Sequence, residues 1–409
     1  MLRPECRAVA LLCLLLVVSL ALVAWGRNDL APTSSSTDAA GYVHVRDFNP
    51  DVPWCVQVLK FDRARSDFEL HSTLARNQIL GLSTLSRQIA DLPPEWGQPL
   101  VGINADFYVA DQGAYIGDPR GLQILEGEVV STPTDGSSFW IDPSGQPRIG
   151  PVTSQFRVTW PDGTSTPMGL NEERGRASAV LYTPRLGEST RNSGGGFELV
   201  LEPAGEGPWL PLQLGRTYTA KVRERRLGSS TPLKAGFLVL SVGPALANNP
   251  ASPILAEQGT IVKISTATTP DLSGVKTAIS GGEVLVRDGQ KVPVKMPQTL
   301  AYKYRSMFER HPRTAIGAND RTIFFVQVDG RQPRLSMGMT LNELGDYMFK
   351  LGCTQALCLD GGASSTFWLA GKVMNSPCHG RERDIANGLV LIQKGKRPTA
   401  SEDRHPSGS

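Results

Sequence analysis

A carboxylate at the end of a predicted strand is the strongest candidate for chemistry in this sequence. Asp360 follows the short apolar run 356–359, and the next residues are Gly361, Gly362, Ala363, Ser364 and Ser365. On a loop of this composition, backbone amides and hydroxyl groups can converge on one ligand. The alternative is a glycine turn in which the Asp360 carboxylate makes only a local hydrogen bond to its own backbone.

A second acidic candidate follows an earlier apolar run. Asn104 and Asp106 come directly after residues 100–103. Because they are two residues apart in an extended segment, their side chains point to the same face. An amide and a carboxylate are then presented together. The alternative interpretation is a polar turn that closes a core strand.

Arginine side chains provide candidates for holding an anion. Arg313 lies on a rigid turn within residues 311–317, where its guanidinium could bind a phosphate through two hydrogen bonds. Arg383 and Asn387 precede another apolar run, and Glu283 is a lone acid after two glycines. The alternatives for these residues are a solvated charge, a structural ion pair, a surface loop or, for Glu283, a hairpin turn.

Other common catalytic and metal-binding patterns are not found. The chain has no G-x-S-x-G motif and only five histidines, of which His311 precedes a proline and is expected to be structural or a hydrogen-bond donor. Cys353 and Cys358 lack the spacing of a zinc site. No cofactor is firmly expected, and a single divalent cation held by Asp106 and Asp360 is the remaining metal option, since hard cations need only oxygen ligands.

The elements that must position these residues are short strands separated by turns. Gly (42) and Pro (30) are frequent, which favours many tight turns over a helical bundle. A capping box at Thr340 and Glu343 predicts a helix that ends before Gly352, and residues 82–92 have helical spacing. The runs that predict strands include 56–59, 68–71, 100–103, 122–125, 128–130, 179–182, 197–201, 237–241, 322–328, 356–359 and 389–392. The predicted fold is α+β, a strand-rich single domain over residues 41–393 with mixed sheets and a few packed helices.

The N-terminal segment bears on the cellular location of the protein. Arg3 and Arg7 precede an apolar run over residues 8–25, which predicts a signal peptide or an N-terminal membrane anchor over 1–26. Residues 27–40 are expected to form a flexible linker and 394–409 a disordered tail. The protein is therefore expected to be exported and to be periplasmic, extracellular or anchored by its N-terminal segment. Export permits disulfides among Cys55, Cys353, Cys358 and Cys378, and no pairing can be read from the sequence.

The charge balance limits the class of partner. Of the 409 residues, 42 are Lys or Arg and 39 are Asp or Glu, so the net charge is only +3. A nucleic-acid partner would normally require a stronger basic excess, so none is expected, and a membrane is expected to be contacted only through the N-terminal segment. The oligomeric state is not predicted.

Five motifs occur in an order that resembles the phosphodiester glycosidase family. They are Asn104-Ala105-Asp106-Phe107-Tyr108, the segment 311–317, Asp329-Gly330-Arg331, the segment 336–341 and Leu359-Asp360-Gly361-Gly362. The resemblance covers roughly residues 42–393. It implies a hydrolase that cleaves a sugar-1-phosphodiester, and its partner is then a sugar-phosphate diester or a phosphate-linked glycan.

That reaction assigns expected roles to the candidate residues. Breaking the anomeric C–O bond expels a phosphate monoester, which is already a good leaving group, so the site must mainly hold the phosphate and stabilise an oxocarbenium-like centre. The catalytic candidates are Asp106, Asp360 and Arg313, and which aspartate is base or nucleophile stays open. The substrate-binding candidates are Asn104, His311, Gly361, Gly362, Ser364, Ser365, Glu283, Arg383 and Asn387. The alternatives are a non-catalytic module that binds anionic polysaccharide and a metal-dependent phosphodiesterase.

Overall fold

A computed structural model describes residues 33–35, 41–111, 113–134, 136–228, 230–248, 256–295 and 302–395. The expected leader, most of the expected linker and nearly all of the expected tail lie outside these residues. Among the described residues, none of the helices combines the length and the apolar character needed to cross a membrane.

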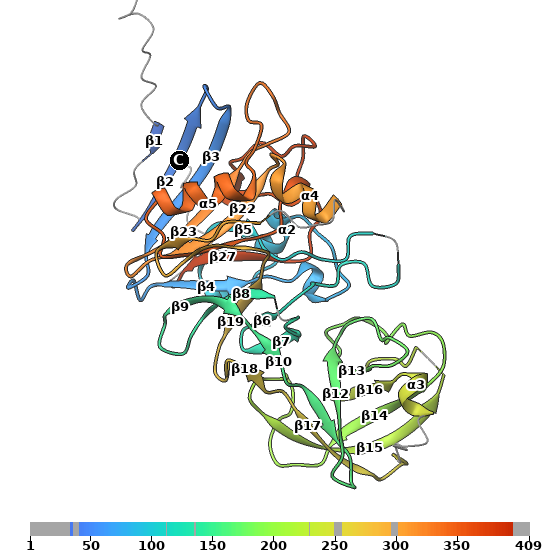
Figure 1. Ribbon diagram of the computed structural model, residues 1–409. Helices are drawn as coiled ribbons and strands as arrows, with labels where there is room; N and C mark the ends of the chain where they lie inside the picture. The colour runs from blue at the N-terminus through green and yellow to red at the C-terminus, as the bar shows by residue number, and fades with distance from the viewer. Residues whose placement is uncertain are drawn as a thin grey trace, which may run out of the picture.

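The largest element is an eight-stranded sheet (Figure 1). Its spatial order is β1 (Thr33–Ser35), β2 (Tyr42–Asn49), β3 (Trp54–Asp62), β23 (Thr322–Val328), β22 (Arg313–Ala318), β24 (Gln355–Cys358), β20 (Val284–Arg287) and β21 (Gln290–Lys291). Helix α5 (Leu341–Lys350) packs on β20, β21 and β24, and its buried face includes Leu344 and Met348. The short helix α4 (Tyr302–Phe308) contacts α5.

A five-stranded sheet lies against the other face of this sheet. Its order is β26 (Lys372–Val373), β25 (Phe367–Leu369), β5 (Gln98–Asn104), β27 (Gly388–Gln393) and β4 (Phe68–Ser72). One apolar core joins the two sheets, with Phe325 and Leu357 from the first and Ile103 and Leu391 from the second. Helix α2 (Leu85–Ala90) covers the outer face of β5 and β27. This shared core includes Ile103 and Leu359, which come shortly before Asp106 and Asp360, so buried side chains fix the strand ends that carry the two candidate aspartates.

A second five-stranded sheet connects this body to a closed barrel, which Figure 1 shows set apart from the sheets. The sheet has the order β7 (Glu128–Ser131), β6 (Gln123–Leu125), β19 (Thr277–Ser280), β8 (Ser137–Ile141) and β9 (Pro147–Pro151). The barrel contains β11 (Arg157–Thr159), β12 (Ser165–Leu170), β13 (Ala179–Tyr182), β16 (Leu238–Val242), β14 (Phe197–Pro203), β15 (Thr217–Leu227) and β17 (Ile261–Ser265). The pair β10 (Thr153–Ser154) and β18 (Thr268–Thr269) lies at the junction, and α3 (Pro244–Ala247) follows β16.

The predicted strand-rich α+β fold with mixed sheets and few helices is confirmed. The capping box is formed: the Thr340 hydroxyl accepts from the Glu343 amide at 3.1 Å, and the Glu343 carboxylate accepts from the Thr340 amide at 2.9 Å. Gly352, with φ of +88°, follows the helix as expected of a glycine C-cap.

Two expectations differ from the structure. Part of the expected flexible linker is strand β1, which pairs with β2 in antiparallel register. The expected disulfides are absent from the described residues, because all four cysteines there are free thiols. Cys55, Cys353 and Cys358 are buried and Cys353 and Cys358 contribute to the apolar core beneath α5, so these thiols act as small core side chains.

Candidate active site

Two strand pairs bring the predicted aspartates to one place. In the antiparallel pair β5–β27, Asn104 lies opposite Gly388, so Asp106 just beyond β5 meets Asn387 just before β27. In the pair β22–β24, the chain leaving β24 continues beside β22, where the Leu359 amide donates to the Thr314 carbonyl at 2.8 Å. The two sheets therefore end next to each other, and both candidate loops leave at this edge.

Asn104 links the two loops. Its side-chain Nδ2 donates to the main-chain carbonyl of Asp360 at 2.7 Å, and its Oδ1 accepts from the Thr314 hydroxyl at 2.7 Å and the Thr366 amide at 3.0 Å. The Asp360 amide also donates to the Ala105 carbonyl at 2.9 Å. The Asn104 amide is therefore engaged by the protein and holds the loop that carries Asp360.

Asp106 is buried, with 2% of its surface exposed, and Asn387 holds it through two hydrogen bonds. Asn387 Nδ2 donates to Asp106 Oδ2 at 2.8 Å, and the Asp106 amide donates to Asn387 Oδ1 at 2.9 Å. Asp106 Oδ1 has no hydrogen-bond partner of normal geometry among the described residues. Burial raises the pKa of Asp106 to about 8; Asn387 and Ser280 oppose this shift, and the charge of Asp360 adds to it. The carboxyl group is therefore largely protonated at neutral pH.

Asp360 is less buried and retains its charge more readily. Its Oδ1 accepts from the Gly361 amide at 2.8 Å. Burial raises the pKa of Asp360 to about 6, and hydrogen bonding from Ser364, followed by the Gly361 amide, limits that rise. At neutral pH the two aspartates therefore differ in protonation, with Asp106 as the acid form and Asp360 as the carboxylate.

Two exposed arginines act electrostatically on the half-buried carboxylate of Asp360. Arg383 and Arg120 are both exposed, and the positive charge of each lowers the pKa of Asp360. Arg383 Nη1 lies 3.5 Å from the buried Ser364 hydroxyl, and its guanidinium lies 5.5 Å from the ring centre of Tyr108. We refer to Asp106, Asp360, Asn387, Ser364 and Arg383 as the carboxylate site.

A further arginine lies beside the glycine loop. Gly362 has φ of +64°, and a Cβ atom there would come within 3.1 Å of Arg331 Nη2. Arg331 Nε donates to His311 Nδ1 at 3.3 Å. Burial lowers the pKa of His311, as do the charges of Arg313 and Arg331, which keeps this imidazole neutral and able to accept that bond. Glycine at 362 therefore permits the close approach of the Arg331 guanidinium.

Arg313 is buried and engaged by main-chain carbonyls. Its Nε donates to Met339 at 2.8 Å, and its Nη2 donates to Ser306 at 2.6 Å and Glu309 at 2.9 Å. These bonds fasten the end of α4 to the strand edge. Arg313 therefore ties these carbonyls to the strand edge, and its predicted roles in catalysis and in contact with a phosphate stay predictions.

The remaining predicted residues are placed around the same loop with different exposures. The Gly362 amide donates to the Pro312 carbonyl at 2.9 Å, so this amide and that of Gly361 are engaged within the protein. Ser365 is buried, and its hydroxyl lacks a partner among the described residues. Glu283 is exposed, and its carbonyl accepts from the Cys358 amide at 3.0 Å. Their predicted roles in substrate binding stay predictions.

The sequence interpretation missed four residues around the carboxylates. Arg120 lies in the loop before β6, Arg331 was noted only as part of a family motif, and Ser280 ends β19. Gln123 carried a signal that could have been used: it is a polar residue in a predicted apolar strand, and such a residue must find a buried partner. No group of three or more His, Cys, Asp or Glu side chains arranged to hold a metal ion is found within the described residues.

The comparison with protein families identifies the class of protein. Residues 217–392 match the phosphodiester glycosidase family, and this stretch includes Asp360, Arg383 and Asn387. Over this region the chain is similar to the phosphodiester glycosidase family, which is the family that its motifs resemble. Asp106 comes from outside the matched region and is brought to it by the pairing of β5 with β27.

Two curated relatives match shorter segments. The chain is 32% identical over 119 residues to the uncharacterized prophage-derived protein YomE of Bacillus subtilis. It is 31% identical over 108 residues to the N-acetylglucosamine-1-phosphodiester alpha-N-acetylglucosaminidase of Bos taurus. The matches cover 29% and 26% of this chain but only 18% and 20% of the two relatives. The chain thus matches about a fifth of each curated relative.

Two solved structures share the fold. A hypothetical protein from Synechocystis aligns with a TM-score of 0.69 at 19% identity, over 89% of this chain and 64% of that one. A protein from Burkholderia pseudomallei, whose description assigns it provisionally to export, aligns with a TM-score of 0.64 at 22% identity, over 83% of this chain and 74% of that one. At these identities the likeness concerns the fold alone.

Proposed function

We propose that this chain is an exported glycosidase that hydrolyses a sugar-1-phosphodiester linkage. The observation that carries the proposal is the pair Asp106 and Asp360, whose surroundings separate their pKa values at one end of two packed sheets. Enzymes that hydrolyse a bond at an anomeric carbon usually use two carboxyl groups in different protonation states. The family match over residues 217–392 supports the same class of reaction.

The protonation states assign roles to the two aspartates. The ionised Asp360 is suited to activate water or to attack the anomeric carbon. The protonated Asp106 is suited to donate a hydrogen bond or a proton to the phosphate oxygen that leaves. The anomeric C–O bond breaks with its electron pair going to the phosphate monoester, and water supplies the new hydroxyl group of the sugar.

The arginines are suited to hold the phosphate. Arg383 and Arg120 are exposed, and both act electrostatically on Asp360, so a phosphate bridging them would place its sugar beside that carboxylate. Arg331, next to Gly362, is a third cation on the same loop. In this arrangement Asn104, Asn387 and Arg313 position the acids and the loop, because their polar groups already contact the protein.

The export component rests on the N-terminal sequence. Arg3 and Arg7 ahead of the apolar run 8–25 have the composition of a signal peptide or anchor. Cell fractionation of the full chain tests it: recovery only in the cytoplasm would contradict export.

Hydrolysis of UDP-N-acetylglucosamine in water labelled with heavy oxygen tests the reaction, with a panel of other UDP-sugars to allow for a different sugar. We expect label in the released sugar and none in the phosphate product. Asp106→Asn and Asp360→Asn should each reduce turnover by about 10²–10⁴-fold. The matched control is Asp346→Asn, which removes an exposed carboxylate paired with Lys291 and should leave turnover unchanged.

Label in the phosphate would show attack at phosphorus and contradict the glycosidase mechanism. Loss of turnover on chelation would favour the metal-dependent phosphodiesterase instead. Binding of the whole panel without turnover would favour the polysaccharide-binding module.

A further inference from the structure

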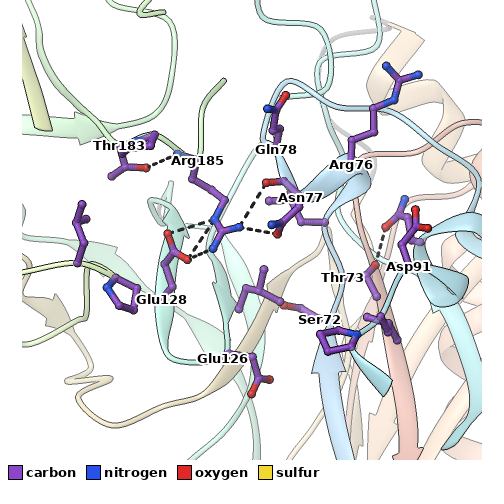
Figure 2. A pocket seen from close by; sticks show the side chains of 18 of the residues that line it. Ser72, Thr73, Arg76, Asn77, Gln78, Asp91, Glu126, Glu128, Thr183 and Arg185 are labelled. Atoms are coloured by element: carbon purple, nitrogen blue, oxygen red, sulfur yellow. Dashed lines mark hydrogen bonds and ion pairs between the residues drawn. The ribbon is translucent and has the colours of Figure 1, made fainter. Parts of the chain in front are cut away.

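A large cavity lies apart from the carboxylate site, where the barrel meets the rest of the molecule (Figure 2). Its volume is about 1020 Å³. Its walls come from the 3-10 helices η2 (Ala75–Asn77) and η3 (Pro94–Trp96), from the hairpin β6–β7, and from the segment after β13 of the barrel. Pockets that hold drug-sized ligands have about 300–1,000 Å³, so this cavity can hold a ligand of that size or larger.

The charged side chains in the cavity wall are mostly paired with one another. Figure 2 shows Arg185 between the carboxylate of Glu128, with which it forms an ion pair, and Asn77, whose Oδ1 accepts from Arg185 Nη1 at 2.5 Å. Glu126 contacts His71 at 2.6 Å, and Asp91 contacts Arg87 at 2.9 Å. Because the Arg185–Glu128 and Arg87–Asp91 pairs are compensated, and the charges of Arg76 and Glu126 are opposite, the cavity offers hydrogen-bonding groups with little net charge. This favours a neutral ligand over a nucleotide or another polyanion.

Among the described charged residues of the cavity wall, Arg76 differs because its guanidinium forms no ion pair. It is exposed, and in Figure 2 it points away from the Arg185–Glu128 pair. One cation that faces outward does not make the interior an anion site.

An aromatic ring supplies the apolar part of the cavity. Trp96 lines it, and His71 stacks on the indole with ring centres 4.6 Å apart and an interplanar angle of 20°. This stacking fixes the plane of the ring. Leu92 and Leu125 add apolar surface nearby. A flat apolar ring beside planar amide, guanidinium and carboxylate groups matches the chemistry of a sugar, which has an apolar C–H face and hydroxyl groups around its rim.

We propose that this cavity binds a neutral oligosaccharide segment, with a sugar ring on Trp96 and hydroxyl groups bonded to Asn77, Gln78, Arg185 and Glu128. The site is separate from the carboxylate site, and its occupation does not require the chain to be a hydrolase. In a polymeric or glycoconjugate substrate it would hold a part of the glycan away from the bond that is cut.

Calorimetric titration of the full chain with chitohexaose and with maltohexaose tests the proposal. We expect one of these neutral hexasaccharides to bind with one-to-one stoichiometry. Trp96→Ala should weaken binding about tenfold or more. Ala235→Trp is a second variant that adds bulk to the exposed wall residue Ala235 without removing a packed side chain, and it should abolish binding at an unchanged unfolding temperature. The control is Phe48→Ala, which removes an aromatic ring that is 40% exposed on β2 and should bind as the wild type does.

The outcomes separate this proposal from the proposed function. Binding that survives Asp106→Asn and Asp360→Asn but is lost in Ala235→Trp supports the cavity, whether or not the chain turns over a phosphodiester. Absence of binding by both hexasaccharides at millimolar concentration would overturn it. So would binding that Ala235→Trp leaves intact, or displacement of the bound sugar by inorganic phosphate.

Discussion

The side-chain amide of Asn387 forms hydrogen bonds with both the carboxyl group and the main-chain amide of Asp106. Its Nδ2 donates to the carboxyl Oδ2 at 2.8 Å, and its Oδ1 accepts from the main-chain amide at 2.9 Å, although the two residues are 281 positions apart. Only one orientation of the Asn387 amide satisfies both contacts. The position and the hydrogen bonding of Asp106 are therefore set by a residue that enters from another strand.

Replacing Asn387 should change the titration of Asp106 as well as its position. Asn387→Ala removes a hydrogen bond that lowers the pKa of Asp106, so this pKa should rise further. If Asp106 acts in its protonated form, the alkaline limb of the pH profile of kcat/KM should move to higher pH while the rate falls. The profile of Asn375→Ala, which removes another buried loop amide, should keep its alkaline limb. An unshifted limb in Asn387→Ala would separate Asp106 from the titrating step.

Gln123 should act as a positioning residue one step further from the carboxyl group. It is fully buried; its Nε2 donates to the Thr73 carbonyl at 2.8 Å, and its Oε1 accepts from Asn387 Nδ2 at 2.9 Å. Because a carbonyl can only accept, the Gln123 amide has one orientation, and this in turn orients Asn387. We expect Gln123→Leu to lower kcat about tenfold with little change in KM, and to shift the alkaline limb as Asn387→Ala does.

The matched control for Gln123 is Gln88→Leu. Gln88 is also a buried glutamine, and it accepts from the Thr73 hydroxyl at 2.6 Å without contacting Asn387. Both variants should lose stability, but only Gln123→Leu should lose turnover. Equal losses of kcat in the two variants would reduce Gln123 to a general structural role.

The sequence was sufficient for features that are encoded locally. The helix after Thr340 was predictable because its capping box and its C-terminal glycine lie within the same short segment. The strands before Asp106 and Asp360 were predictable because each is a compact apolar run. The aspartates themselves were identified because each follows such a run and lies in a motif that resembles the phosphodiester glycosidase family.

The remaining features depend on which distant segments meet. Arg313 was predicted as an anion ligand from its turn, and no local pattern shows that its Nε and Nη2 groups donate to the carbonyls of Met339, Ser306 and Glu309. Closure of the barrel joins β11 to β17 and brings together segments about a hundred residues apart. The cavity beside the barrel arises only from that arrangement, so neither Trp96 nor Arg185 carried a signal of its own.

The rate of phosphodiester hydrolysis should have a bell-shaped dependence on pH. Activity should fall below about pH 6, as Asp360 becomes protonated, and above about pH 8, as Asp106 loses its proton. Arg383→Gln should move the acidic limb to higher pH, because the Arg383 charge lowers the pKa of Asp360. The exposed Arg381→Gln is the control and should leave that limb in place. A flat pH profile between pH 5 and 9 would contradict the assignment of Asp106 as the acid and Asp360 as the carboxylate. If Arg383→Gln raises KM without moving the acidic limb, Arg383 contacts the phosphate but does not set the pKa of Asp360.

Asp106→Asn should stabilise the fold while it removes activity. Burial raises the pKa of Asp106 from its ordinary value of 3.8 to about 8, so the folded state holds a proton that the unfolded chain releases above about pH 4. The resulting stability is fully present below pH 4 and is lost as the pH rises toward 8, and an asparagine, which does not titrate, escapes this loss. We expect a gain in unfolding free energy of up to about 5 kcal/mol at pH 8, and little or no gain at pH 4, from urea denaturation at both values. A variant that is less stable than the wild type at pH 8 would show that Asp106 is charged and well compensated in the fold, and Asp106 would then lose its assignment as the proton donor.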